Sequence, residues 1–159
     1  MIPTETVAAT VLADAAVPYR LHEHPPARTE AELHLTGLDV DTSAKTLAFT
    51  LPDGRLILAA IPGRARLRYG NLARALGVPR SALRPMPADQ LQTLGMEPGG
   101  VTPLCTDPRV TLVLERELLA HDVLYCGSGS PTVSVELASA DLVTLFPDAV
   151  LADLVSPAP

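Results

Sequence analysis

The amino-acid sequence predicts an α+β fold, with a mixed, largely antiparallel sheet that is curled into an open barrel and flanked by helices. Segments with strand and helix patterns are interspersed without the regular strand–helix–strand alternation of a parallel α/β sheet. Several expected strands are joined by short turns, which only antiparallel neighbours permit. The length of 159 residues suits a single core, so we expect one domain over residues 1–155 and a loose tail at 156–159.

The N-terminal segments are expected to form two helices and a strand. Apolar residues near helical spacing predict a helix over residues 4–16, which Thr4 can cap and Pro18 would end. Residues 19–23 have the pattern of a short strand. A threonine cap followed by acidic residues in the first turn predicts a second helix over 29–34.

A hairpin and a short helix should follow. Residues 42–51 read as a strand, and the nearly continuous apolar run at 55–61 is typical of a central strand. The Pro-Asp-Gly sequence at 52–54 is a turn signal, so the two strands should form a hairpin. A helix over 71–76 should end at Gly77, a residue that favours helix C-termini.

The last third should alternate short strands with loops and finish in a helix. The expected elements are a helix within 81–95, a loop at 97–100, a strand at 110–114, a turn or short helix at 118–120, a strand at 123–126, a loop at 127–131, a strand at 132–137, and a helix over 139–145 that Ser139 caps and Pro147 breaks.

The composition excludes several classes of protein. With 47% hydrophobic and 19% charged residues, the chain has enough apolar surface to fold rather than remain disordered. No apolar run reaches the roughly 18 residues of a membrane span, and the N-terminus lacks the basic start and apolar stretch of a signal peptide. Cys105 and Cys126 do not form a CxxC motif, so we expect free thiols, a cytoplasmic protein and no cofactor.

Positive charge is concentrated in one segment, although the net charge of the chain is −6. Between Gly54 and Ala88 there is no aspartate or glutamate. The arginines of this segment are Arg55, Arg64, Arg66, Arg68, Arg74, Arg80 and Arg84. Such an asymmetry indicates a surface that meets a polyanion, although a solvated helix and turn rich in arginine would look the same.

Lys45 is the only lysine, in a chain that has eleven arginines. Period-2 alternation places it on the same face of its strand as Leu47, Phe49 and Leu51, so we expect it to point inward at the start of an apolar face. An ammonium is a compact charge with three donors that can meet a hydroxyl, carbonyl or phosphate. The alternative is a lysine that extends to water or protects a sheet edge.

Two glycine-containing loops are candidates for binding a ligand. Adjacent glycines at Gly99 and Gly100 allow backbone N–H groups to approach a carbonyl or oxyanion closely. The loop at residues 127–131 could present hydroxyl and N–H groups, but it matches neither a P-loop nor a dinucleotide-binding turn. Ordinary turns remain the alternative interpretation of both loops.

Other catalytic arrangements have less support. His22 and His24 could share a strand face, but no third ligand stands at a telling spacing, so we expect no metal site. Cys105 or Cys126 could pair with His34 or His121 in a small-ester hydrolase, although nothing in the local sequence favours such a pair. No Ser–His–Asp elbow motif is present.

Taken together and in order, five segments resemble the motifs of the YbaK/aminoacyl-tRNA deacylase family, which includes prolyl-tRNA-editing domains. They are the lysine strand at 44–47, an A-x-x-L-G helix at 71–77, Gly95 with the loop Pro98-Gly99-Gly100-Val101-Thr102-Pro103-Leu104, the GxxxP loop at 127–131, and a closing strand and helix at 135–138 and 140–142. The similarity extends over nearly the whole chain, and the GG-V-T-P-L loop downstream of the lysine is its most specific part.

The resemblance implies an editing domain of mixed sheet that hydrolyses the ester of mischarged tRNA in trans, with tRNA(Pro) as a candidate. It implies that the 3′ acceptor end of aminoacyl-tRNA is the partner, and prolyl-tRNA synthetase is a further candidate. No general base stands out, and in this family water or a group on the substrate is thought to fill that role. The alternative is a non-catalytic module of the same fold that binds tRNA ends or nucleotides.

The implied site residues fall into three groups. The catalytic group is Lys45, Gly99, Gly100, Gly127 and Ser128, in which the lysine anchors the terminal adenosine and the backbone N–H groups bind the ester carbonyl. The substrate-binding group is Tyr19, Thr46, Leu47, Gly129, Ser130 and Pro131. The tRNA-binding group is Arg64, Arg66, Arg68 and Arg74.

Overall fold

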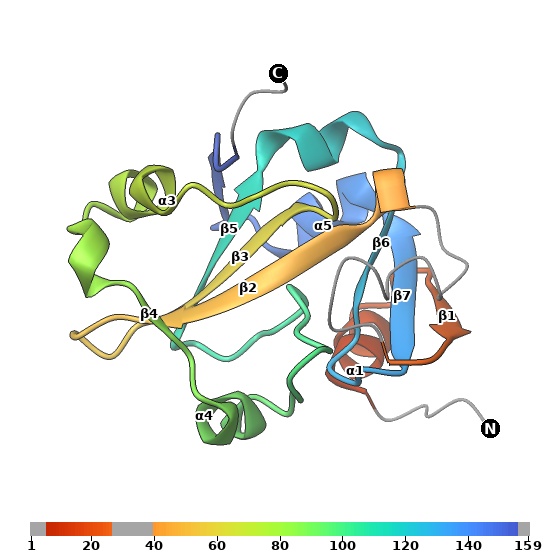
Figure 1. The fold of residues 1–159 in the computed structure, drawn as a ribbon. Helices are drawn as coiled ribbons and strands as arrows, with labels where there is room; N and C mark the ends of the chain where they lie inside the picture. The colour runs from red at the N-terminus through yellow and green to blue at the C-terminus, as the bar shows by residue number, and fades with distance from the viewer. Residues whose placement is uncertain (1–5, 27–39, 156–159) are drawn as a thin grey trace.

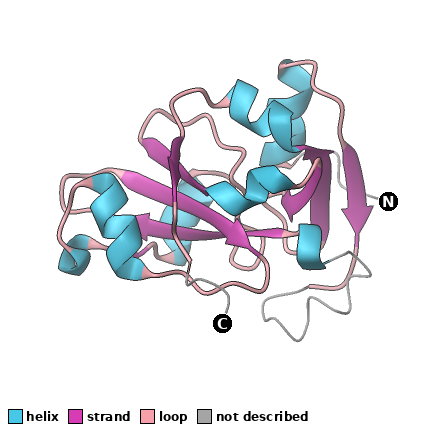
Figure 2. Cartoon of the chain, turned by 90° about the horizontal axis from the view of Figure 1, so that it is seen from above, coloured by secondary structure: helices cyan, strands magenta, loops and turns pink. Residues whose placement is uncertain are grey.

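The structure, a computed structural model, describes residues 6–26 and 40–155 (Figure 1). Its strands form one five-stranded and one three-stranded sheet, which occupy separate parts of the molecule with helices around them (Figure 2). This arrangement confirms the α+β class. The helix expected over 29–34 lies outside the described residues. Within the described ranges, no helix is both long enough and apolar enough to cross a bilayer.

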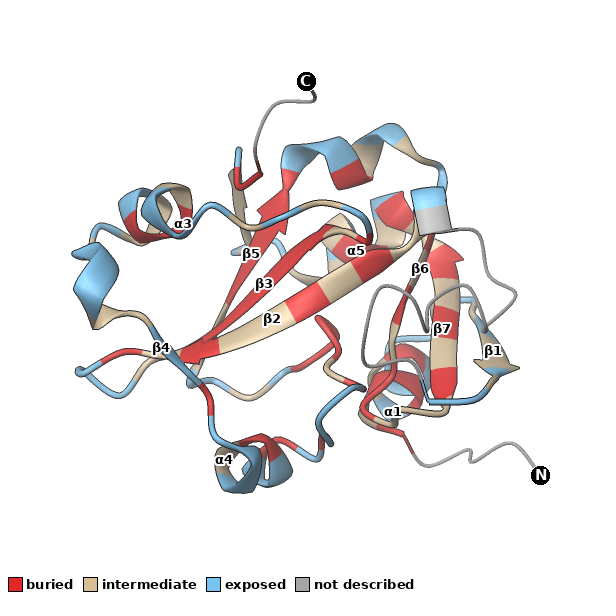
Figure 3. Cartoon of the chain, viewed as in Figure 1, coloured by how far each residue is buried: buried red, intermediate tan, exposed pale blue. Residues whose placement is uncertain are grey.

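The larger sheet has the strand order β4-β2-β3-β5-β8. Its β2–β3 and β2–β4 pairs are antiparallel, and its β3–β5 and β5–β8 pairs are parallel. The strand expected to be central, β3, is buried from Leu56 to Ile61 (Figure 3). In chain order the strands are β2 (Ala44–Thr50), β3 (Leu56–Pro62), β4 (Arg84–Pro85), β5 (Val110–Glu115) and β8 (Val150–Ala152).

The predicted hairpin joins β2 to β3. The Leu51 N–H donates to the Arg55 carbonyl at 3.0 Å, and the Gly54 N–H donates to the Leu51 carbonyl at the same distance. Gly54 has φ 92°, a value that glycine adopts without steric cost. The Asp53 carboxylate accepts the Arg55 N–H, which completes the turn expected from the Pro-Asp-Gly sequence.

The smaller sheet has the order β1-β7-β6 and is antiparallel throughout. Its strands are β1 (Arg20–Glu23), β6 (Val123–Gly127) and β7 (Val133–Ala138). Alternate residues of β7, namely Val133, Val135 and Leu137, are buried, whereas Ser134 and Glu136 on the other face are only partly covered. Since most strand pairs in the two sheets are antiparallel, the expected mixed, largely antiparallel pairing is confirmed.

The expected open barrel is wrong, because neither sheet closes and the strands divide between two sheets. Within the described ranges, the direct pairing between the sheets is one isolated parallel bridge from Ser43 to Tyr125. Along β2, only Phe49 and Thr50 pair with β4. The N-terminal part of β2 therefore presents a sheet edge toward β6 rather than continuing into a closed ladder.

Among the described residues, four α-helices flank the sheets: α1 (Val7–Asp14), α3 (Tyr69–Leu76), α4 (Ala88–Thr93) and α5 (Ser139–Leu145). The N-cap of α1 is Thr6, whose hydroxyl accepts the Ala9 N–H at 3.2 Å; the expected cap, Thr4, lies outside the described residues. Gly77 ends α3 in the left-handed conformation, as predicted. The expected Ser139 cap is wrong: Ala138 is the N-cap of α5, and the Ser139 hydroxyl donates to the His121 carbonyl.

Three 3₁₀ turns, η2 (Val40–Thr42), η3 (Arg80–Ala82) and η4 (Arg116–Ala120), complete the described elements. Two apolar clusters hold them together. The larger cluster joins both sheets to α1, α4 and α5 through residues such as Leu12, Leu91 and Leu142. The smaller cluster packs α3 on the opposite face of the five-stranded sheet and includes Leu72 of the helix and Phe49 of β2.

Two glycine-containing loops contact each other backbone to backbone. The Gly129 N–H donates to the Gly100 carbonyl at 2.7 Å, and the Glu97 N–H donates to the Gly129 carbonyl at 2.9 Å. A Cβ atom on Gly127 would overlap the Val101 carbonyl, and one on Gly100 would overlap the backbone of Ser130. Both glycines are therefore needed for the close approach of segments 97–101 and 127–131.

We expect Gly127→Ala to lower the free energy of unfolding by roughly 1–3 kcal/mol, because the added methyl group meets rigid backbone. Gly70→Ala is the matched control, since open space surrounds that position and alanine favours helix. Urea unfolding of both variants measures the difference. Equal stability of Gly127→Ala and the wild type would contradict the loop contact.

Candidate functional site

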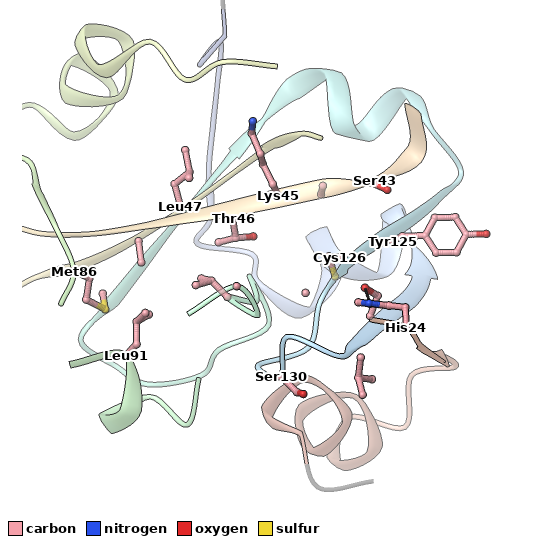
Figure 4. A pocket seen from close by; sticks show the side chains of 17 residues that line it. His24, Ser43, Lys45, Thr46, Leu47, Met86, Leu91, Tyr125, Cys126 and Ser130 are labelled. Atoms are coloured by element: carbon pink, nitrogen blue, oxygen red, sulfur yellow. Dashed lines mark hydrogen bonds between the residues drawn. The ribbon is translucent and has the colours of Figure 1, made fainter. Parts of the chain in front are cut away.

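A cavity of about 360 Å³ lies between the edge of β2, the two glycine loops and the small sheet. Residues 43–48 form one wall, and β6, β7 and His24 form the opposite wall. Met86, Leu91 and Val101 make one region apolar, whereas His24, Ser130 and Ser134 supply polar groups elsewhere (Figure 4). A concave, partly apolar site with a few convergent polar groups is the usual form of a small-ligand site.

The edge of β2 orients backbone groups toward this cavity. The Ala48 carbonyl accepts the Met86 N–H at 3.0 Å, so its backbone points away from β3. The Leu51 N–H and the Ser43 carbonyl instead bond toward β3, to Arg55 and Gly63. Because backbone direction alternates along a strand, the N–H and C=O groups of Thr46 point outward like those of Ala48. β4 does not reach this position, so they face the cavity side.

The Thr46 hydroxyl is a buried polar atom that lacks a partner. Thr46 is 9% exposed and lines the cavity, and its Oγ1 is the one such side-chain atom in the described ranges. A buried hydroxyl without a hydrogen bond costs roughly 1–3 kcal/mol. Its neighbours on the same face, Ala44 and Ala48, are small and apolar. The position is thus suited to bind a polar group of a ligand.

Lys45 belongs to the cavity wall, but its side chain leaves β2 on the face opposite Thr46 (Figure 4). Figure 4 shows Lys45 and Leu47 projecting from one face of β2 and Thr46 from the opposite face. Leu47, Phe49 and Leu51 join the same apolar cluster, which agrees with the predicted alternation. Lys45 itself is half-buried, and in Figure 4 its ammonium points away from Thr46, His24 and Ser130.

The predicted loop residues divide into two sets. Gly99, Gly127 and Ser130 line the cavity together with Lys45, Thr46 and Leu47. Gly100, Ser128, Gly129 and Pro131 lie outside this lining. The Gly100 N–H donates to the Glu97 carbonyl at 2.9 Å, so its hydrogen bond is used within the loop.

Ser128 is fully buried and holds the shape of its loop. Its hydroxyl donates to the Val133 carbonyl at 2.6 Å and accepts the Ser130 N–H at 3.2 Å. Tyr19, expected as a pocket wall, packs instead against the larger apolar cluster. Neither residue lines the cavity in this structure.

Sequence reasoning missed a hydrogen-bonded pair on the cavity wall. Ser134 Oγ lies 2.7 Å from His24 Nε2, and the Pro25 carbonyl oxygen lies 2.8 Å from His24 Nδ1. Both His24 and Ser134 line the cavity. The histidine was visible in the sequence as part of the His-Glu-His segment, but nothing there pointed to a serine 110 residues away.

The neighbouring histidine is engaged elsewhere. His22 Nε2 lies 2.8 Å from a Glu136 carboxylate oxygen, and its ring packs edge-on against Tyr125. In the described part of the chain, no three His, Cys, Asp or Glu side chains come together as metal ligands.

The cysteines are poorly suited to nucleophilic catalysis. Cys126 lines the cavity, but burial raises the pKa of its thiol to about 12. Burial is also the main cause of the raised pKa of Cys105, which lies away from this cavity. Because the thiolate is the reactive form, both groups are weak nucleophiles at neutral pH. His34, one of the imagined partners, lies outside the described residues.

The arginine-rich segment forms an exposed surface beside α3. In the extended chain that leads to α3, Arg64, Arg66 and Arg68 are exposed, whereas Ala65 and Leu67 between them pack on the smaller cluster. Period-2 alternation therefore turns three guanidinium groups outward. Arg64 makes a weak, exposed ion pair with Asp41 at 3.5 Å.

An exposed aromatic ring lies on the same surface. Tyr69 is 43% exposed, and the Arg80 guanidinium lies 5.8 Å from its ring centroid. Arg74 follows in the last turn of α3. Arginines around an accessible ring are typical of surfaces that contact nucleic acid.

Comparisons with known proteins give consistent results. The model of the aminoacyl-tRNA editing domain family matches residues 24–145. The hypothetical protein APE2540 is 29% identical, with a TM-score of 0.80 over 94% of this chain and 99% of that one. A candidate trans-editing enzyme for prolyl tRNA synthetase is 24% identical, with a TM-score of 0.79 over 99% of both chains, and shows the same fold.

A scaffold from a study of epitope backbone grafting by computational design is also similar. It is 25% identical, with a TM-score of 0.81 over 99% of this chain and 100% of that one. The fold is therefore present in proteins of about the same length as this chain.

We expect Thr46→Val to raise the free energy of unfolding by about 1 kcal/mol, because it removes a buried hydroxyl without a partner and keeps the shape. Thr102→Val is the matched control: that hydroxyl is fully buried but accepts the Leu104 N–H at 3.1 Å, so its loss should destabilise. Urea unfolding measures both changes. A similar loss of stability in the two variants would contradict the assignment of Thr46.

Proposed function

The chain belongs to the aminoacyl-tRNA editing domain family, and from this premise we propose that it is a trans-acting deacylase that hydrolyses the ester of mischarged tRNA. The single observation that supports this most is the cavity beside β2, whose wall includes Lys45, Gly99 and Thr46, the last with a hydroxyl that lacks a partner. Such a site can hold a small amino acid and a polar ester group at the same time.

In the proposed complex the aminoacyl group occupies the cavity and the terminal adenosine lies at the edge of β2. Lys45 anchors the ribose or phosphate of that adenosine. Since the Gly100 amide is already bonded, Gly99 and the backbone near Gly127 supply the donors for the ester carbonyl as negative charge develops. One well-placed donor of this kind contributes roughly 2.7–4 kcal/mol to the transition state.

Thr46 has a separate role in this proposal. Its hydroxyl and outward-facing backbone groups hydrogen-bond the polar part of the bound amino acid, while Leu47 and Ser130 bound the space around its side chain. Cavity size then selects against larger cognate residues. Hydrophobic fit alone discriminates one methylene by only about 1–3 kcal/mol, so steric exclusion carries most of the selectivity.

The arginine surface is proposed to bind the tRNA. Arg64, Arg66, Arg68 and Arg74 contact phosphates of the acceptor end, which their exposure and local lack of acidic residues favour. Prolyl-tRNA synthetase is a candidate partner, because a structural relative is a candidate trans-editing enzyme for that synthetase. Mischarged tRNA(Pro) is accordingly the first substrate to assay. A non-catalytic tRNA-end-binding module is the competing outcome.

Deacylation of a panel of mischarged tRNAs tests this function. We expect hydrolysis above background for at least one of them, and we expect Lys45→Ala to lower kcat/KM roughly 10- to 100-fold, as loss of a charged hydrogen bond implies. Lys45→Arg is the matched variant, since it keeps the charge but changes its shape.

Two outcomes of this assay contradict the proposal. Tight binding of every tRNA without hydrolysis would assign the chain to the non-catalytic class. Full activity of Lys45→Ala would remove the lysine from the mechanism while leaving the deacylase intact.

The affinity for tRNA should fall steeply as salt rises, because phosphate contacts release counterions. We expect Arg66→Gln to weaken binding and to reduce the slope of log K against log[salt] by about 1. Arg109→Gln is the control, because Arg109 is already paired with Asp107 at 2.9 Å on another surface. Fluorescence anisotropy at several salt concentrations gives both slopes. Equal effects of the two substitutions would count against the arginine surface.

A further inference from the structure

The proposed function does not name a general base, and the geometry of His24 and Ser134 is suited to this role. A carbonyl oxygen can only accept, so His24 Nδ1 donates its proton to Pro25 at 2.8 Å. In the neutral ring Nε2 then carries the lone pair, and the Ser134 hydroxyl donates to it across 2.7 Å. The pair therefore has a defined tautomer, with an acceptor nitrogen next to a hydroxyl on the cavity wall.

This arrangement has the parts of a proton-accepting pair. A base lies within hydrogen-bond reach of a hydroxyl, and a third group orients the base. Here the orienting group is a backbone carbonyl instead of a carboxylate. Ser134 stands opposite Gly127 in the β6–β7 register, so the hydroxyl lies on the strand next to the one that leads into the glycine loop.

We propose that His24 is the general base of the deacylation, and that Ser134 carries the proton between His24 and the attacking water. This inference rests on the proposed function. The water oxygen bonds to the ester carbonyl carbon while its proton passes to Ser134 Oγ, and the proton of Ser134 passes to His24 Nε2.

The second half of the reaction restores both groups. When the tetrahedral intermediate collapses, the bond between the carbonyl carbon and the ribose oxygen breaks. The imidazolium returns its proton through Ser134 to that ribose oxygen. The products are the free amino acid and a tRNA with a free terminal hydroxyl, and no oxidant or further reactant is required.

His22 is the natural comparison in the same segment of the chain. It lies within β1, two residues before His24, but its Nε2 is held by Glu136 at 2.8 Å and it does not line the cavity. The two imidazoles are near neighbours in the sequence, yet only His24 both lines the cavity and hydrogen-bonds a hydroxyl. Substitution of His22 therefore controls for general effects on β1.

Steady-state deacylation by His24→Gln, His22→Gln and the wild type tests the inference. General-base catalysis contributes about 10²- to 10⁴-fold, so His24→Gln should lower kcat by that factor with KM little changed. His22→Gln should keep kcat near the wild-type value. Added imidazole should partly restore the rate of His24→Ala but not that of Lys45→Ala, because only the former lacks a base. Loss of a structural contact would not respond to imidazole.

The outcomes separate this inference from the proposed function. Wild-type hydrolysis with full activity of His24→Gln overturns the base and leaves the deacylase standing, whereas an inert wild type overturns both. If His24→Gln does not fold, Ser134→Ala carries the test: an unchanged kcat overturns the relay, and a lower kcat at constant KM supports it. A covalent aminoacyl adduct on Ser134, detected by mass spectrometry, would also overturn the relay, because it makes Ser134 the nucleophile.

Discussion

The backbone-to-backbone contact between segments 97–101 and 127–131 is the constraint on which the cavity depends. No side chain can stand at Gly100 or Gly127 without overlapping the opposite loop. The hydrogen bonds from Gly129 to Gly100 and from Glu97 to Gly129 then fix the small sheet beside the edge of β2. Since the two sheets share only one isolated bridge in the described ranges, this contact sets the distance between the cavity walls. The glycines thus act first on architecture, and only Gly99 and Gly127 also reach the cavity.

Local sequence was enough to predict the elements that rest on local chemistry. The hairpin follows from its turn sequence, α3 from its glycine terminator, and β3 from its apolar run. The sequence did not reveal β4 or β8, because two or three residues show no period and pair only when the sheet is assembled. The barrel was wrong for a related reason. Whether neighbouring strands close or divide into two sheets is set by packing between distant segments, which no local pattern encodes.

The residues of the candidate site also differ in whether local sequence could predict them. Lys45 and Thr46 could be predicted because they neighbour each other on one strand and carry family motifs, and both line the cavity. The pair of His24 and Ser134 could not be predicted, because the two residues are distant in the sequence. The pairing of β1 with β7 brings their segments together, and His24 Nε2 then lies 2.7 Å from Ser134 Oγ. Ser128 illustrates the opposite error of interpretation. A serine in a glycine loop suggests a presented hydroxyl, but full burial directs that hydroxyl to the Val133 carbonyl, where it shapes the loop.

The edge of β2 joins these features into one physical argument. An unpaired strand edge and a buried hydroxyl without a partner both cost free energy, and folded proteins normally remove both. Here they coincide at Thr46, between two alanines that leave the space open. A valine would continue the apolar pattern of that face at no steric cost, so core packing does not account for the hydroxyl. A ligand that hydrogen-bonds to this edge would offset the free energy that the unpartnered hydroxyl costs, which makes the Thr46 segment of β2 the part of the cavity best suited to hold a polar group.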